Sequence, residues 1–161
     1  MPAFTKFQQF VGDIGTAKHD LNADTLMLLL TNTAPNVADT IVDTTTTPCT
    51  VKSTSNAAEI AAGSGYTKKG GQVAANAYSQ SAGTAKLTGN KVTITASGGS
   101  IGPFRYAVLF NDSKGTTATR PVIAYADYGS AITLNDGESI TFGKDTAGNN
   151  WDATIPILSV A

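Results

Sequence analysis

The chain has 161 residues, of which 14% are charged, and 11 basic against 12 acidic residues give a formal net charge of -1. This length corresponds to one domain with its own core, and the scattered basic residues make nucleic-acid binding a poor hypothesis. No apolar run reaches the roughly 20 residues of a membrane-spanning helix, and Gln8 and Gln9 interrupt any signal peptide. We therefore expect a single β domain over 1–161, made and folded in a cytoplasm, without a nucleic-acid or membrane partner.

The first segment, 4–19, has apolar residues at helical spacing. Phe4, Phe7, Val11 and Ile14 follow one another at intervals of three or four residues, which is the period of one helix face. The sequence therefore predicts a short N-terminal α-helix over 4–19 whose apolar stripe belongs to the core. The next segment, 24–31, is a continuous apolar run of strand length, which predicts a central strand covered on both faces.

Residues 36–57 form a Thr-rich stretch that predicts a long loop. Its scattered apolar side chains are Val37, Ile41, Val42 and Val51. A structureless stretch of this length inside a compact domain is usually functional or mobile. We expect this loop to be mobile in the free protein and to offer its apolar residues to a neighbouring protein. A tolerated surface insertion is the alternative.

Short apolar segments separated by turn residues fill the rest of the chain. Gly89 and Asn90, between 84–88 and 91–96, predict a two-residue hairpin turn. About eight short strands at such spacing are typical of antiparallel sandwiches and barrels. The predicted fold class is mainly β: an antiparallel β-sandwich or jelly-roll-like barrel with a short N-terminal α-helix.

The side chains that carry chemistry do not form a catalytic pattern. His19 is the only histidine, and at a helix end it would interact with the last carbonyl groups. Cys49 has no basic neighbour closer than Lys52, which predicts an unreactive thiol. Asp127, at a strand end, is weak evidence for an acid or base. We therefore expect no enzyme activity, no catalytic or metal-binding residue and no cofactor.

Trp151 is the sole tryptophan and stands between the polar residues Asn150 and Asp152. An exposed Trp151 would be a stacking platform for a sugar or an anchor for a protein partner. A partly buried Trp151 would instead close one end of the sandwich, and the sequence favours this second interpretation. The candidate partner interface consists of Val37, Ile41, Val42, Val51 and Trp151.

Several sequence blocks, spread over nearly the whole chain, carry a family resemblance. The clearest is Ala96-Ser97-Gly98-Gly99-Ser100-Ile101-Gly102-Pro103-Phe104-Arg105-Tyr106-Ala107-Val108-Leu109-Phe110-Asn111-Asp112. The others cover 4–11, 23–35, 58–71, 121–125 and 132–138. Together they resemble a family of small structural proteins of tailed-bacteriophage virions, of the capsid decoration or head-associated type.

The resemblance implies a virion protein that acts by packing against other proteins. The expected role is a decoration or cement protein on the outer capsid surface, bound to the major capsid protein or other virion proteins. It would be assembled into the virion in the host cytoplasm, and a trimer is the expected form of self-association. A neck, tail or fibre component, with glycan binding as one such role, is the alternative. The chain departs from the family pattern around 41–55 and 143–152, and such loops often carry binding specificity.

Overall fold

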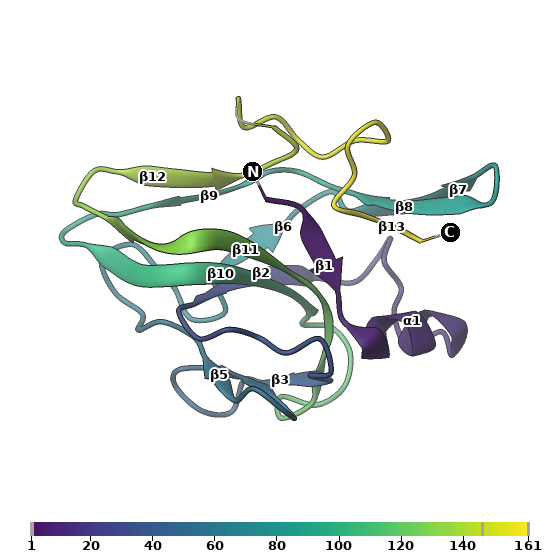
Figure 1. Cartoon of the computed structure of the whole chain (residues 1–161), viewed down its shortest axis with the longest axis horizontal. Coiled ribbons are helices and arrows are strands. Elements are labelled where there is room, and N and C mark those ends of the chain that lie inside the picture. The colour runs from purple at the N-terminus through teal and green to yellow at the C-terminus, as the bar shows by residue number, and fades with distance from the viewer. Residues whose placement is uncertain (1, 146, 161) are drawn as a thin grey trace.

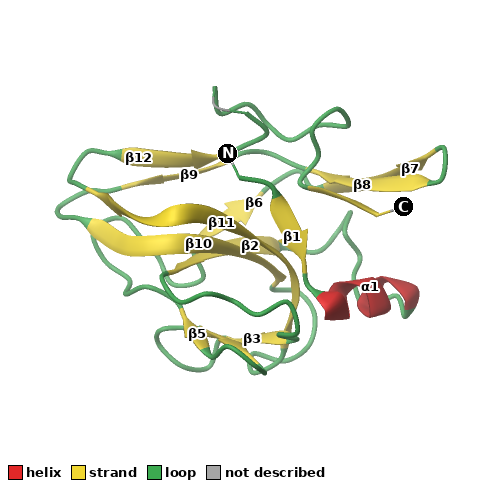
Figure 2. Cartoon of the chain, in the orientation of Figure 1, coloured by secondary structure: helices red, strands yellow, loops and turns green. Residues whose placement is uncertain are grey.

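The computed structural model describes residues 2–145 and 147–160, and it is mainly β, with 46% strand and 5% helix. The sheets are antiparallel and the described residues contain one short helix, which confirms the predicted sandwich-like fold class. Figure 1 shows a central layer of strands with further strands above and below it, and the helix at one side. Figure 2 shows the same arrangement by secondary structure, with long green loops joining the layers.

The central layer is organised around three neighbouring strands. They are β2 (Leu26–Thr31), β10 (Ile101–Asn111) and β11 (Arg120–Leu134), and β10 lies between the other two. The predicted central strand is therefore confirmed, because β2 pairs on both sides and buries both of its faces. The remaining strands of this sheet are β1 (Phe4–Lys6), β3 (Ile41–Asp43), β4 (Thr50–Lys52), β5 (Ala57–Ala58) and β6 (Gly71–Val73).

Two smaller antiparallel sheets lie above the central layer. One consists of β9 (Val92–Thr95) and β12 (Ser139–Phe142); the other consists of β7 (Ala77–Ser81), β8 (Thr84–Thr88) and β13 (Leu158–Val160). Two clusters of buried side chains hold the described residues together. The first lies between the central strands and these two sheets, and includes Phe104, Phe142 and Trp151. The second lies on the opposite face, where β3, β4 and β5 cover the central strands.

The N-terminal segment is only partly helical, so the prediction of a helix over 4–19 is wrong at both ends. Helix α1 covers Gln8–Gly15, and the residues before it form β1, which pairs with β11. The backbone N–H of Phe7 donates to the carbonyl of Ile123, which continues this pairing to the helix start. Val11 of the supposed apolar stripe is 53% exposed, whereas Phe7 and Phe10 are fully buried. The apolar spacing favours a helix, but the edge of β11 offers backbone hydrogen-bond partners to residues 4–6. These residues therefore form a strand instead of the first helical turn.

The segment 36–57 is not a structureless loop, and this prediction is corrected. It contains β3, β4 and the first residue of β5, and Ile41 and Val42 of β3 pair with the start of β11. The carboxylate of Asp39 accepts hydrogen bonds from the backbone N–H groups of Ser53, Thr54 and Ser55 at 3.1, 2.7 and 2.8 Å. The polar side chains therefore order the backbone of this segment, so polarity did not signal mobility here.

The expected hairpin around Gly89 and Asn90 does not form either. β8 pairs with β7 and β13, while β9 pairs with β12. Gly89 instead exchanges backbone hydrogen bonds with Trp151, and a Cβ atom at Gly89 would lie 2.7 Å from Cγ1 of Val73. The glycine is required by this close approach of three chain segments, not by a chain reversal.

Candidate functional site

The residues of the predicted partner interface do not form one surface. Val42 and Val51 are fully buried in the second core cluster, whereas Val37 and Ile41 are half-buried and belong to neither cluster. Trp151 is 4% exposed and lies in the first cluster, where its ring meets that of Phe4 edge to face at 6.2 Å between centroids. The interpretation of Trp151 as an exposed sugar platform is therefore wrong, because its side chain is part of the first core cluster.

Cys49 is enclosed in the second core cluster beside a buried carboxylate. Burial raises the pKa of the Cys49 thiol to about 12, and the nearby charge of Glu59 adds to this effect. Glu59 accepts hydrogen bonds from the hydroxyl of Tyr66 at 2.8 Å and from the backbone N–H of Cys49 at 3.2 Å. The thiol stays protonated at neutral pH, so it is a poor nucleophile.

Asp127, the weak acid–base candidate, is held by Arg105. The guanidinium donates two hydrogen bonds to the Asp127 carboxylate, at 2.7 and 2.9 Å, and the backbone N–H of Gly129 donates a third at 2.7 Å. The bonds from Arg105 keep the pKa of Asp127 below its ordinary value. A general base near neutral pH needs a raised carboxyl pKa, so this environment opposes such a role.

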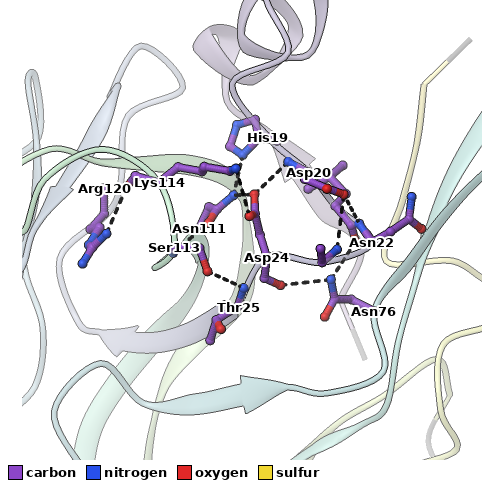
Figure 3. A network of polar contacts seen from close by, with 12 residues as sticks. His19, Asp20, Asn22, Asp24, Thr25, Asn76, Asn111, Ser113, Lys114 and Arg120 are labelled. Atoms are coloured by element: carbon purple, nitrogen blue, oxygen red, sulfur yellow. Dashed lines mark hydrogen bonds and ion pairs between the residues drawn. The ribbon is translucent and has the colours of Figure 1, made fainter.

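His19 lies beyond the end of α1, in the polar network of Figure 3. Nδ1 of His19 is 3.1 Å from Nδ2 of Asn111. This amide nitrogen of Asn111 also donates a hydrogen bond to Oδ2 of Asp24 at 2.7 Å. Oδ1 of Asn111 accepts the backbone N–H of Ser113 at 2.9 Å. These two bonds orient the amide, because Ser113 needs an acceptor and Asp24 needs a donor. The expected contact of His19 with the helix carbonyls is therefore replaced by this amide contact.

The orientation of Asn111 determines the tautomer of His19. Because Asn111 presents an N–H group, Nδ1 of His19 must be the acceptor and Nε2 must carry the hydrogen. Nε2 lies 3.8 Å from Oδ2 of Asp13, too far for a hydrogen bond, and has no hydrogen-bond partner among the described residues. The His19 side chain is 1% exposed, and burial lowers its pKa despite the carboxylates of Asp13 and Asp24. His19 is therefore a neutral structural acceptor.

Ion pairs tie the loop after β10 to the segment after α1. Nζ of Lys114 lies 3.3 Å from Oδ1 of Asp24, and Nζ of Lys18 lies 3.2 Å from Oδ2 of Asp13. In the same region, the backbone N–H of Thr25 donates to Oγ of Ser113 at 2.7 Å. The arrangement fixes the relative positions of α1, the segment after it and the loop after β10.

A cavity of about 470 Å³ opens beside this network. Its walls are formed by the end of α1 and the segment that follows it, by Tyr78 of β7, and by Lys114 of the loop after β10. Sequence reasoning missed this cavity because its walls come from segments more than 30 residues apart. The only sequence signal was Asp20-Leu21-Asn22-Ala23-Asp24 directly after the single histidine, which resembles an ordinary turn.

Comparison of the chain with protein-family models, with curated proteins and with solved structures finds no match. Within residues 2–145 and 147–160, no group of three or more His, Cys, Asp or Glu side chains is placed to hold a metal ion. None of the helical segments in this described part is long and apolar enough to cross a membrane.

Proposed function

We propose that the chain is a non-enzymatic structural protein of a tailed-bacteriophage virion, and that it binds the outer surface of the capsid shell as a decoration protein. The observation that carries the proposal is the position of the resemblance. Its clearest blocks, 96–112 and 121–125, form β10 and the buried half of β11. These strands contribute to both core clusters. The likeness therefore involves the framework of the molecule, and the particle role is what this resemblance implies.

The internal contacts of the reactive side chains support a role without catalysis. His19 serves as a buried hydrogen-bond acceptor, Cys49 is a buried neutral thiol, and Asp127 is paired with Arg105. The Cys49 thiol stays protonated, and the acceptor atoms of His19 and Asp127 are already engaged by Asn111 and Arg105.

The charge distribution supports an outer position in the particle. In the described part of the chain, seven of the 11 basic residues form ion pairs with carboxylates. They are Lys18, Lys52, Lys69, Arg105, Lys114, Lys144 and Arg120. A protein that lines the packaged genome would need free basic side chains for dense phosphates, so this surface fits the outside of the shell better.

The test is the copy number of the chain in purified phage particles, measured by quantitative mass spectrometry. The major capsid protein of the same particles serves as the internal standard. A copy number that matches the capsid protein or its threefold positions supports the decoration role, and a trimer in solution would agree with it. A dozen copies or fewer supports the alternative, a neck, tail or fibre component. Absence of the chain from the particles contradicts both.

A further inference from the structure

We propose that the cavity beside Tyr78 is a binding site for a neutral, polyhydroxylated ligand, that is, a saccharide. This inference does not depend on where the chain lies in a particle. The cavity volume of about 470 Å³ falls in the range of small-molecule sites, and both apolar and polar side chains line it. Its apolar walls are Ile14, Ala17 and Leu21, and its polar residues are His19, Asp20, Asn22, Tyr78 and Lys114.

The polar groups of the cavity keep unused hydrogen-bonding capacity. Oδ1 of Asp20 accepts the backbone N–H groups of Asn22 and Ala23, but Oδ2 has no partner in the described part of the chain. Oδ1 of Asn22 accepts the backbone N–H of Tyr78 at 2.8 Å, which leaves its NH₂ group free. The Tyr78 hydroxyl likewise has no hydrogen-bond partner among the described residues. Asp20, Asn22 and Tyr78 therefore offer an acceptor, a donor and a group that can do both.

This mixture of donors and acceptors favours a sugar over an ion. The carboxylate of Asp20, with that of Asp24 close behind it, would repel a phosphate or a carboxylate ligand. A simple cation would leave the amide donor of Asn22 without an acceptor, and the ammonium group of Lys114 in the cavity wall would repel it. Sugar hydroxyls both donate and accept, so a sugar can satisfy every one of these groups.

Tyr78 supplies the aromatic surface that sugar sites commonly contain. Its side chain is half-buried against the first core cluster. Burial raises the pKa of Tyr78, so the hydroxyl stays protonated and can donate. An aromatic ring with one apolar face and one polar tip suits the apolar C–H face and polar rim of a pyranose. The sequence-based glycan hypothesis, placed on Trp151, thus moves to a different residue.

The experiment is a nuclear magnetic resonance titration of the isotope-labelled full chain with glucose, galactose and N-acetylglucosamine. We expect at least one sugar to shift the backbone amide signals of Asn22, Tyr78 and Lys114 with a millimolar dissociation constant. Tyr78→Phe should weaken binding about fivefold by removing one hydrogen bond, and Asp20→Asn about tenfold by removing a charged acceptor. Tyr125→Phe is the matched control, because Tyr125 packs on the second core cluster, and it should bind like the wild type.

Three outcomes would overturn the proposal. The first is that none of the sugars shifts these amide signals at tens of millimolar. The second is that Tyr78→Phe and Asp20→Asn bind as tightly as the wild type. The third is that tetramethylammonium, used as a cationic probe, shifts the signals while the sugars do not, which would assign the cavity to a cation. Because this readout needs no phage particle, it is distinguishable from a failure of the virion role.

Discussion

His19 is the residue whose environment departs most from the one its sequence position predicted. A buried imidazole normally needs a partner for each ring nitrogen, but among residues 2–145 and 147–160 only Nδ1 has one, the amide of Asn111. Protonation of Nδ1 would place two hydrogen-bond donors, Nδ1–H of His19 and the amide N–H of Asn111, opposite each other. Rotation of the Asn111 amide would not remove the conflict, because Asp24 and Ser113 would then lose their bonds. The folded protein therefore holds His19 neutral.

We expect the free energy of unfolding to fall as the solution is acidified from neutral pH. The pKa of His19 is lower in the folded protein than in the unfolded chain, where it is about 6.5. The stabilisation is fully present above that unfolded value and is lost as the pH falls through the folded pKa, by at most about 1.4 kcal/mol per pH unit. Urea unfolding at a series of pH values measures this slope.

His19→Gln separates this effect from those of other titrating groups. Glutamine offers an acceptor to Asn111 but cannot titrate. The free energy of unfolding of this variant should therefore stay nearly constant between about pH 7 and pH 5. The carboxylates of Asp43 and Asp152 have lowered pKa values, chiefly because Lys52 and Lys144 donate hydrogen bonds to them. Their contribution is present above the unfolded value of about 3.9 and is lost below it, outside this window. A slope equal to that of the wild type would contradict the role of His19.

At the scale of elements, β3 and β4 form a cover for the central strands. Val42 and Val51 face each other in the register of these two strands, and both are fully buried. They pack with Leu29 of β2, Val108 of β10 and other residues of the second core cluster. The hypothesis that this segment awaits a neighbour for its apolar side chains is therefore wrong for Val42 and Val51. For the half-buried Val37 and Ile41, a partner contact stays a prediction.

Val51→Ala should lower the free energy of unfolding by about 2 kcal/mol, because it removes two buried methyl groups and leaves a cavity. Val11→Ala makes the same chemical change on α1, where the side chain is 53% exposed, and should stay within about 0.5 kcal/mol of the wild type. Thermal and urea unfolding of both variants measure the difference. Equal stability of the two variants would mean that β4 does not cover the core in solution.

For the whole molecule, the decisive feature is that both core clusters share the same strands. Within β10, Leu109 belongs to the first cluster, while Val108 and Phe110 belong to the second. Within β11, Ile123 belongs to the first cluster and Val122 belongs to the second. Because successive side chains of one strand point to opposite faces, neither cluster can lose its strands without exposing the other.

We therefore expect one cooperative unfolding transition seen by two probes on opposite sides of the sheet. Trp151 reports on the first core cluster through its fluorescence, and Cys49 reports on the second through its reaction with a thiol reagent. The urea midpoints of the two signals should coincide, as a two-state transition requires. Reaction of Cys49 well before the fluorescence change would show that β3 and β4 open separately, contrary to this expectation.

Much of the candidate site was beyond sequence reasoning. His19, Cys49 and Trp151 attract notice because each residue type occurs once. Their environments depend on residues distant in the chain: Asn111 lies 92 residues from His19, and Tyr78 contacts Asn22 across 56 residues. No local pattern contains such pairings, so the buried tautomer and the cavity beside Tyr78 became visible only in the folded chain.

The sequence by itself determined the mainly β class and the central position of β2, because a continuous apolar run reports burial on both faces and needs only local information. Only the tertiary structure decided which strands pair. It turned 4–6 into a strand on β11, ordered 36–57 around the Asp39 carboxylate, and brought Gly89 to Trp151 instead of a hairpin partner. Strand pairing satisfies backbone groups that are identical in every residue, so the choice of partner depends on long-range packing that no short segment encodes.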